Sequence, residues 1–508
     1  MVDVLLAHSY YLKLDAKQNE KMKPYPPLAT LYAAAILRQS GYSVALFDAM
    51  LSEGEHEFEA ALQRHRPQFV VLYEDNFNFL VKMCLARMRT AAQTMSRTAR
   101  AAGATVIAAG PDVTDRPDLY FAHGVQYALI GEPDNTLPEL LAALTGRSAT
   151  RLCEIAGLAL PDDSTISVVY PSGNVGSVGH DPDPQLRRGH TEGLTRLPET
   201  NLDSLPLPAW DLIDAESYRS AWTNAHGYFS LNMVTTRGCP FHCNWCAKPI
   251  WGQRHAVRSP QSVAEELAHL KRTLKPDHIW FADDIFGLRP GWVVEFAREV
   301  EVRDAAVPFM IQSRVDLMTE KTVEALARAG CVEVWMGAES GSQKVLDAME
   351  KGSRVNQVGP AIARLKAAGI RACLFLQLGY PGETFDDILA TVQMVRDTLP
   401  DNVGISVSYP LPRTKFHAMV REHLGTKANW TDSSDLAMMF QGTYQSPFYR
   451  HLHKLIHHEL ALRQRLAAMV CHDGDRLAAE IDSLALEWME LGRLEQTSRS
   501  ARPTVIGK

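Results

Sequence analysis

Residues 235–246 read Thr-Thr-Arg-Gly-Cys-Pro-Phe-His-Cys-Asn-Trp-Cys, and no other stretch of the chain is as informative. Its cysteines, Cys239, Cys243 and Cys246, are spaced four and then three residues apart, so their thiolates can converge on one side of a short loop. No fourth cysteine lies nearby. A cubane iron–sulfur cluster normally has four cysteine ligands, so a three-cysteine site would leave one iron open to a substrate or cofactor. The alternatives are a zinc site completed by His242 and a disulfide.

Composition and charge narrow the class of protein. The chain of 508 residues is long enough for roughly two to four domains, and its 46% hydrophobic and 22% charged content is typical of globular proteins. A net charge of -7 disfavours binding to nucleic acid, which needs a basic surface. No apolar stretch approaches the length of a membrane span, and the first residues read as a strand rather than a signal peptide. We therefore expect a cytoplasmic protein.

Residues 1–146 alternate short apolar runs with helical patterns. Strands are expected at Val2–Ala7, Ser43–Phe47, Phe69–Tyr73, Thr105–Ala109 and Tyr127–Ile130, and helices at Leu28–Gln39, Glu57–His65, Val81–Ala102 and Thr136–Leu144. This alternation predicts an α/β domain with a doubly wound, Rossmann-like parallel sheet. Ligands of such sheets bind beyond the carboxyl ends of the strands.

Residues 229–422 alternate in the same way. Six strands are expected at Leu231–Thr235, His278–Ala282, Phe309–Ser313, Val332–Met336, Ala372–Leu378 and Gly404–Ser408, each but the last followed by a helical pattern. Six strands in this alternation predict a partial (β/α)6 barrel, whose active site is built at the carboxyl ends of the strands. The cysteine loop follows the first strand and therefore belongs to that rim.

The two remaining segments carry less information. Residues 147–228 are rich in Pro, Gly, Asp and Ser and predict a connector with a small hairpin at Ile155–Leu160 and Thr165–Val169. Residues 423–508 predict a helical extension. There His453 and His457 lie one helical turn apart, which an amphipathic helix explains better than a metal site.

The cysteine spacing, with the aromatic Trp245 before the last cysteine, resembles the cluster loop of the radical S-adenosylmethionine (SAM) enzymes. Residues 1–146 resemble the cobalamin-binding domain found in front of many of these enzymes. The segments that carry this second resemblance are Tyr25-Pro26-Pro27-Leu28, Phe47-Asp48-Ala49, Gly110-Pro111-Asp112 and Gly131-Glu132-Pro133-Asp134. The Asp-x-His-x-x-Gly sequence of base-off cobalamin mutases is absent. The resemblance implies a [4Fe-4S] cluster held by the three cysteines, SAM, and cobalamin as a third cofactor.

The resemblance also implies SAM contacts at the strand ends of the barrel. Asp283 and Asp284 follow the second strand and correspond to the segment that receives the SAM amino group, although Asp284 could equally cap a helix. Ser313 and Arg314 follow the third strand, where an arginine suits the SAM carboxylate or ribose.

Two further strand ends complete this expected set. Glu339 stands between glycines after the fourth strand, where a ribose diol or an amino group is the natural partner. Gln377 begins a segment that closes over the adenosine in relatives. Arg413 occupies a position that is usually glycine in relatives, so it either alters this turn or points a cation at an acidic substrate.

On the first domain, the expected cobalamin contacts are the strand-end residues Tyr10, Asp75, Gly110, Pro111, Gly131 and Glu132. His8 could serve as an axial ligand, but a histidine bonded within a strand-end loop is the simpler interpretation.

The leading hypothesis is a radical SAM enzyme that cleaves SAM reductively and methylates an unactivated carbon of a small organic substrate with the help of cobalamin. It would need a reducing partner such as flavodoxin or ferredoxin. An alternative is oxidative cyclisation or rearrangement, as in the anaerobic magnesium-protoporphyrin ester cyclase. A tRNA methylthiotransferase would require an N-terminal cysteine trio and a basic C-terminal module, and the sequence shows neither. A cobalamin- or metal-sensing binding protein would lack the full set of SAM-facing groups.

Overall fold

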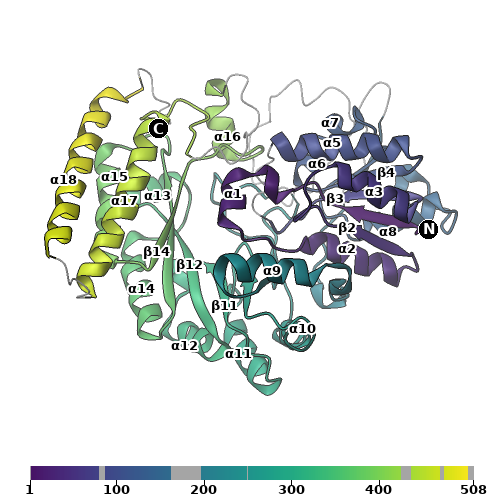
Figure 1. Ribbon diagram of the computed structural model, residues 1–508, viewed down its shortest axis with the longest axis horizontal. Coiled ribbons are helices and arrows are strands. Elements are labelled where there is room, and N and C mark those ends of the chain that lie inside the picture. The colour runs from purple at the N-terminus through teal and green to yellow at the C-terminus, as the bar shows by residue number, and fades with distance from the viewer. Residues whose placement is uncertain are drawn as a thin grey trace.

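The computed structural model describes residues 2–78, 86–161, 196–248, 250–424, 436–468 and 474–500. It contains two six-stranded sheets and one two-stranded ribbon. The N-terminal sheet with its helices lies at one end of the molecule, the second sheet lies in the middle, and the C-terminal helices α17 (Ser446–Ala467) and α18 (Gly474–Thr497) lie at the other end (Figure 1). None of the helices in these ranges is long and apolar enough to cross a membrane.

The first sheet has the strand order β2-β1-β3-β4-β5-β6. Its strands are β1 (Val4–Ala7), β2 (Val44–Phe47), β3 (Phe69–Tyr73), β4 (Thr105–Ala109), β5 (Tyr127–Leu129) and β6 (Leu158–Ala159). The first five pair in parallel, which confirms the predicted doubly wound sheet. The predicted hairpin differs: β6 pairs antiparallel with β5 at the edge of this sheet, and the expected strand Thr165–Val169 lies outside the described residues.

Helices cover both faces of this sheet because its strands are apolar on both sides. In β1, Val4 and Leu6 pack into one hydrophobic layer, and Leu5 and Ala7 pack into the opposite one. The helices of this domain are α1 (Ala16–Lys21), α2 (Leu28–Gln39), α3 (His56–His65), α5 (Ala86–Ala101), α6 (Pro111–Asp115), α7 (Pro117–Phe121) and α8 (Thr136–Leu144). The predicted helix Val81–Ala102 is therefore observed over its described part.

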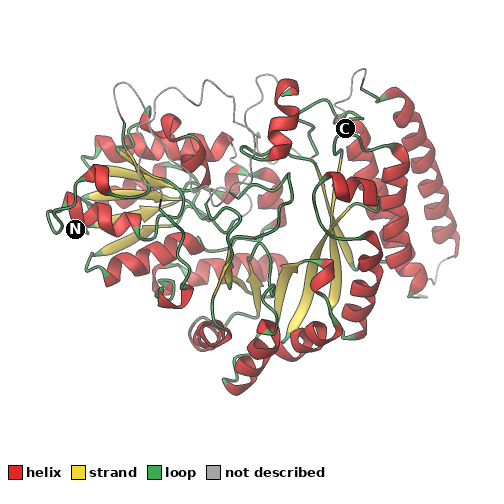
Figure 2. Cartoon of the chain, turned by 180° about the vertical axis from the view of Figure 1, so that it is seen from behind, coloured by secondary structure: helices red, strands yellow, loops and turns green. Residues whose placement is uncertain are grey.

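The second sheet is entirely parallel, with the order β14-β13-β12-β11-β10-β7. Its strands are β7 (Ser230–Met233), β10 (His278–Phe281), β11 (Phe309–Ser313), β12 (Cys331–Glu339), β13 (Arg371–Leu378) and β14 (Asn402–Val407). The helices around it are α10 (Pro260–Thr273), α11 (Trp292–Val302), α12 (Glu320–Ala329), α13 (Gln343–Ala348), α14 (Val358–Ala367), α15 (Phe385–Thr398) and α16 (Lys415–Val420). In the described chain β7 and β14 are the two edges and do not pair, so the predicted partial barrel is confirmed. Figure 2 shows both sheets inside their layers of helices.

Residues before α2 pack on one face of the barrel sheet, over β7 and β10. The Tyr25 hydroxyl lies 3.2 Å from the Ser230 hydroxyl, and the Asn232 amide donates to the Pro26 carbonyl at 3.1 Å. The Tyr25 ring also packs at 4.8 Å from the ring of Trp280 on β10. The helix α9 (Ala215–His226), which precedes β7, packs beside the same segment. The two domains are thus joined at this face.

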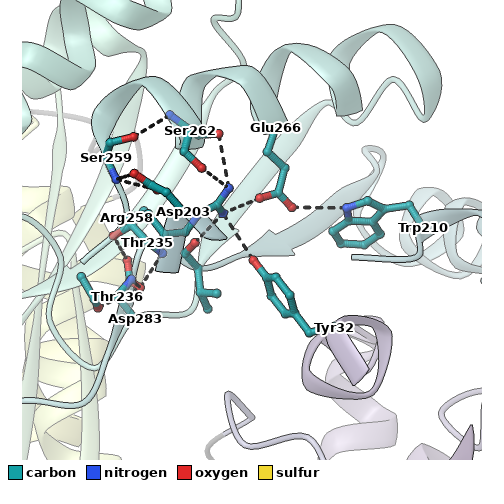
Figure 3. Close-up of polar contacts among 11 residues, drawn as sticks. Tyr32, Asp203, Trp210, Thr235, Thr236, Arg258, Ser259, Ser262, Glu266 and Asp283 are labelled. Atoms are coloured by element: carbon teal, nitrogen blue, oxygen red, sulfur yellow. Dashed lines mark hydrogen bonds and ion pairs between the residues drawn. The ribbon is translucent and has the colours of Figure 1, made fainter. Parts of the chain in front are cut away.

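A buried ion pair forms a second junction between the domains (Figure 3). Arg258, which follows the ribbon strand β9 (Ala256–Val257), pairs with Glu266 of α10, and both side chains are at most 5% exposed. Arg258 also donates to the Tyr32 hydroxyl of α2 at 3.4 Å, and Glu266 accepts the indole N–H of Trp210 at 3.3 Å. Both domains and the segment between them meet at this pair.

Candidate active site

The cysteine loop starts at β8 (Thr236–Arg237) and ends at β9, and these two strands pair antiparallel to close it. A glycine is required directly before the first cysteine. Gly238 has a φ of +76°, and a Cβ there would lie 2.3 Å from the Arg254 carbonyl oxygen. The three thiols of the loop are unpaired and partly exposed, so the disulfide alternative has no support.

Asn244, in the middle of the cysteine loop, fixes the loop to the barrel. Its backbone N–H donates to the Met349 carbonyl at 3.0 Å, and its side-chain amide donates to the Ala348 carbonyl at 2.7 Å. Its side-chain oxygen accepts from the Tyr380 hydroxyl at 3.0 Å, and its carbonyl accepts from the Phe416 N–H at 3.0 Å. These partners lie more than 100 residues away, so sequence reasoning missed this anchor.

The loop offers three soft thiolate ligands, and iron–sulfur clusters are held by ligands of this kind. Burial raises the pKa of Cys246 to about 12, and the nearby charge of Asp284 adds to this effect. Burial also raises the pKa of Cys239. The charge of Cys243 raises the pKa of both Cys239 and Cys246, but in the described chain no three His, Cys, Asp or Glu side chains converge to metal-binding distance. His242, which a zinc site would need, is exposed. A three-cysteine cluster fits this loop better than zinc.

The two adjacent carboxylates after β10 have different surroundings. Asp283 is buried and accepts hydrogen bonds from the backbone N–H and the hydroxyl of both Thr235 and Thr236, at 2.7 to 3.0 Å (Figure 3). It therefore braces the start of the cysteine loop, and burial raises its pKa to about 6. Asp284 is exposed, and its charge acts on the thiols of Cys239 and Cys246. Of the two carboxylates, Asp284 is the one that is exposed near these thiols.

Arg314 and Ser313 lie at the end of β11, as expected. The Arg314 guanidinium stacks on the Phe241 ring of the cysteine loop at 3.8 Å and donates to Asp316 at 2.9 Å. The Ser313 hydroxyl donates to the Phe286 carbonyl at 3.0 Å. Arg314 thus connects the third strand end to the loop between the first two cysteines.

Glu339 occupies a β-bulge at the end of β12, with a φ of +59°. Its carboxylate pairs at 2.7 Å with the Lys351 ammonium, and both side chains are at most 8% exposed. Burial opposes the charge on Lys351, yet Glu339 raises the pKa of this ammonium. Lys351 was missed from the sequence, although a buried Glu339 requires a cation. Lys351 follows α13, and the expected SAM set did not include it.

Gln377 and Trp245 complete the expected SAM set. The Gln377 amide donates to the Ser408 hydroxyl of the next strand end at 3.0 Å. The Trp245 indole N–H is buried and has no hydrogen-bond partner among the residues described. Buried donors are normally hydrogen-bonded, so an unused donor directly before Cys246 fits a site in which a bound group accepts this hydrogen bond.

The residues expected to contact cobalamin lie where the strands of the first sheet reach their carboxyl ends, a border of the sheet called the strand-end edge. Gly110 has a φ of +142°, and a Cβ there would lie 2.6 Å from the Cβ of Glu74. Pro111 begins α6, and the Gly131 N–H donates to the Thr114 hydroxyl at 3.1 Å. These residues shape the backbone of this edge.

The side chains of Tyr10, Asp75 and Glu132 are buried and hydrogen-bonded to protein. The Tyr10 hydroxyl donates to Asp15 at 3.3 Å. Asp75 accepts the backbone N–H groups of Ala29 and Phe77 at 3.2 and 3.1 Å, and burial raises its pKa to about 6. Glu132 accepts from Arg237 and Trp251 of the cysteine-loop region. The edge expected to hold cobalamin therefore contacts the cysteine loop directly.

His8 is turned away from an axial-ligand role. Its Nε2 lies 2.8 Å from an Asp48 carboxylate oxygen, and the ring is 1% exposed. Asp48 also accepts the Tyr218 hydroxyl at 2.8 Å. The histidine is thus held by the neighbouring strand-end loop, which follows β2, and has the structural role of the simpler interpretation.

Comparisons with known proteins agree with both domain assignments. Residues 233–395 match the Radical SAM superfamily, and residues 23–141 match the B12 binding domain. The uncharacterized methyltransferase PH0819 of Pyrococcus horikoshii is 26% identical over 329 residues, 64% of this chain and 65% of that protein. The anaerobic magnesium-protoporphyrin IX monomethyl ester cyclase of Rubrivivax gelatinosus is 28% identical over 42% of this chain and 38% of its own. The chain spans less than two thirds of the length of either relative.

A solved structure shows the same arrangement of domains. TsrM of Kitasatospora setae, described as a radical S-adenosylmethionine methyltransferase with cobalamin and a [4Fe-4S] cluster bound, superposes with a TM-score of 0.64. The match covers 83% of this chain and 75% of TsrM at 19% sequence identity, so it speaks for the fold alone. The expected resemblance is confirmed by the two domain matches, and the chain belongs to the radical SAM proteins that carry a B12-binding domain in front of the radical SAM barrel.

Proposed function

We propose that this protein is a cobalamin-dependent radical SAM enzyme that methylates an unactivated carbon of a small organic substrate. Cys239, Cys243 and Cys246 hold the cluster. When bound, the cluster supplies the electron that cleaves SAM to methionine and a 5′-deoxyadenosyl radical, and cobalamin supplies the methyl group. We further propose a cytoplasmic location and a flavodoxin or ferredoxin as the source of electrons.

The observation that carries this proposal is the contact between the cysteine loop and the strand-end edge of the first sheet. The Trp251 indole N–H, from the cysteine loop, donates to Glu132 of that edge at 3.0 Å. A methyl group on cobalamin at this edge would lie beside a substrate radical generated at the barrel rim, and reacting groups must be held close together. A cobalamin sensor would need no such contact with a cluster loop.

The residues around the loop support SAM binding. Asp284 offers a carboxylate to the SAM amino group, while Arg314 and Lys351 offer cations to its carboxylate. Asp283, in contrast, supports the loop through its bonds to Thr235 and Thr236. We propose Asp284 rather than Asp283 as the SAM-binding member of this pair.

Iron content and SAM cleavage test the proposal. Anaerobically reconstituted protein should bind about four irons per chain and produce 5′-deoxyadenosine with a chemical reductant. Cys243→Ala should abolish both the iron binding and the production of 5′-deoxyadenosine. Cys153→Ala is the matched control, because Cys153 is an exposed free cysteine outside the loop. Tightly bound zinc without iron, or unchanged 5′-deoxyadenosine from Cys243→Ala, would refute the proposal.

Oxidative cyclisation is the second candidate, favoured by the similarity to the Rubrivivax gelatinosus cyclase. The two reactions differ in their by-products. Transfer of a SAM methyl group leaves S-adenosylhomocysteine, whereas cyclisation without methyl transfer produces none. Formation of S-adenosylhomocysteine in step with 5′-deoxyadenosine during turnover would support methylation, and 5′-deoxyadenosine alone would support cyclisation.

A further inference from the structure

The barrel is open between its two edge strands, and the chain after each edge reaches the first domain. Arg237 ends β8, directly after β7. Arg413 lies in the loop after β14. β7 and β14 are the opposite edges of the same sheet. The two arginines therefore contact the N-terminal domain from opposite sides of the opening.

Arg237 binds the loop that follows β5. Its guanidinium donates to Glu132, and to Asp134 at 2.6 Å, and all three side chains are at most 6% exposed. Asp134 also accepts the Tyr73 hydroxyl at 2.5 Å, which fixes it to the end of β3. Charge-assisted hydrogen bonds of this type are stronger than hydrogen bonds between neutral groups.

Arg413 binds the segment that follows β4. It donates to the Thr114 carbonyl at 2.9 Å, and its Nε lies 3.1 Å from the Asp115 carboxylate, which is 9% exposed. Arg413 has a φ of +60°, a left-handed conformation that glycine adopts at lower cost. The guanidinium is thus directed at the N-terminal domain rather than at a substrate.

The two segments that receive the arginines are bonded to each other. The Gly131 N–H, beside Glu132, donates to the Thr114 hydroxyl at 3.1 Å. Hydrogen bonds therefore connect Arg237 to Arg413 through these two loops, by way of the adjacent residues Glu132 and Gly131 and of Thr114. It connects one edge of the barrel to the other through the N-terminal domain.

We propose that Arg237 and Arg413 are positioning residues that hold the strand-end loops of the N-terminal domain across the open side of the barrel. The loops concerned are those expected to hold cobalamin, so the two contacts fix the distance between that edge and the cysteine loop. The consequence for cobalamin rests on the proposed function, whereas the contacts themselves do not.

Hydrogen exchange on the full-length protein tests the contact at Arg413. The Thr114 and Arg116 amides are bonded within α6, to the Gly110 and Asp112 carbonyls, and report opening of this segment. Arg413→Gly removes the contact and also relieves the left-handed backbone, so the fold should be kept. We expect about tenfold faster exchange at these amides, the scale of one lost charge-assisted hydrogen bond.

Arg396→Gln is the matched control, because it breaks a two-pronged pair with Glu459 that joins α15 to α17 away from the opening. It should leave the Thr114 and Arg116 amides unchanged. Unchanged exchange in Arg413→Gly, or equal acceleration in Arg396→Gln, would overturn the proposal. Glu132→Gln should also speed exchange at the Thr114 and Arg116 amides, because Gly131 beside Glu132 is bonded to Thr114, and no effect of Glu132→Gln there would mean that the two loops open independently.

Cobalamin binding gives the second readout. The hydroxocobalamin Kd should rise about tenfold in Arg413→Gly while its Tm stays at that of the wild type. An unchanged Kd beside accelerated exchange would overturn the positioning role. If the wild type itself binds no hydroxocobalamin, the proposed function fails, and the exchange experiment still decides whether the contacts hold the loops.

Discussion

Removing the charge of Glu266 should destabilise the barrel strongly, because it leaves the Arg258 guanidinium buried without a counter-charge. In Glu266→Gln, Arg258 keeps only neutral acceptors, which are the Val234 carbonyl at 3.1 Å, the Ser262 carbonyl and hydroxyl at 3.3 and 3.1 Å, and the Tyr32 hydroxyl at 3.4 Å. Breaking one side of such a buried pair typically costs about 3–5 kcal/mol. For a barrel of this size that corresponds to a fall of roughly 6–20 °C in Tm.

Thermal and urea denaturation followed by tryptophan fluorescence measure this effect. The exposed pair of Glu490 with Arg493 provides the control, and Glu490→Gln should leave the transition unchanged. Replacing both partners, Arg258→Met with Glu266→Leu, should recover most of the loss, since two apolar groups leave no unpaired charge. If the free energy of unfolding of Glu266→Gln falls by less than about 1 kcal/mol, the reasoning that Arg258 needs the charge of Glu266 is refuted.

Two further predictions concern the pH dependence and the cysteine loop. Burial raises the pKa of Glu383 to about 8 from 4.5, so the native state holds a proton that the unfolded chain releases, and stability should fall as pH rises from about 5 to 8. Glu383→Gln cannot ionise and should flatten that part of a Tm-against-pH profile; an unchanged slope would contradict this. Gly238→Ala should lower iron uptake after anaerobic reconstitution with an unchanged far-UV circular dichroism spectrum, because its Cβ would clash with the Arg254 carbonyl oxygen. Gly252→Ala, also at positive φ but in open space, is the matched control, and equal iron content in both variants would count against a steric role for Gly238.

The alternation of apolar strands and helices was enough to predict both sheets, because each strand carries its own local pattern. The sequence also placed the cysteines after the first barrel strand, where the structure has them. The role of Asp283 could not be predicted, since nothing local distinguishes it from Asp284, and only the bonds to Thr235 and Thr236 show which carboxylate is buried.

Contacts between distant segments could not be predicted from the sequence for the same reason. Asn244 looks like an ordinary polar residue between two cysteines, and its partners come from three separate elements. Arg413 could be flagged as unusual, but its acceptors lie about 300 residues away in the chain. Local patterns predict elements, whereas the choice of partners depends on how those elements pack.

The packing of Tyr25 and Pro26 on the barrel has a consequence for cutting the protein into parts. Ser230 and Asn232 of β7 pair with His278 and Trp280 of β10, so their side chains lie on one face of the barrel sheet. Tyr25 and Pro26 of the N-terminal domain contact this face at Ser230, Asn232 and Trp280. A truncated barrel expressed alone would expose this face, with the aromatic ring of Trp280, and should associate with itself even if every residue of its catalytic rim is intact.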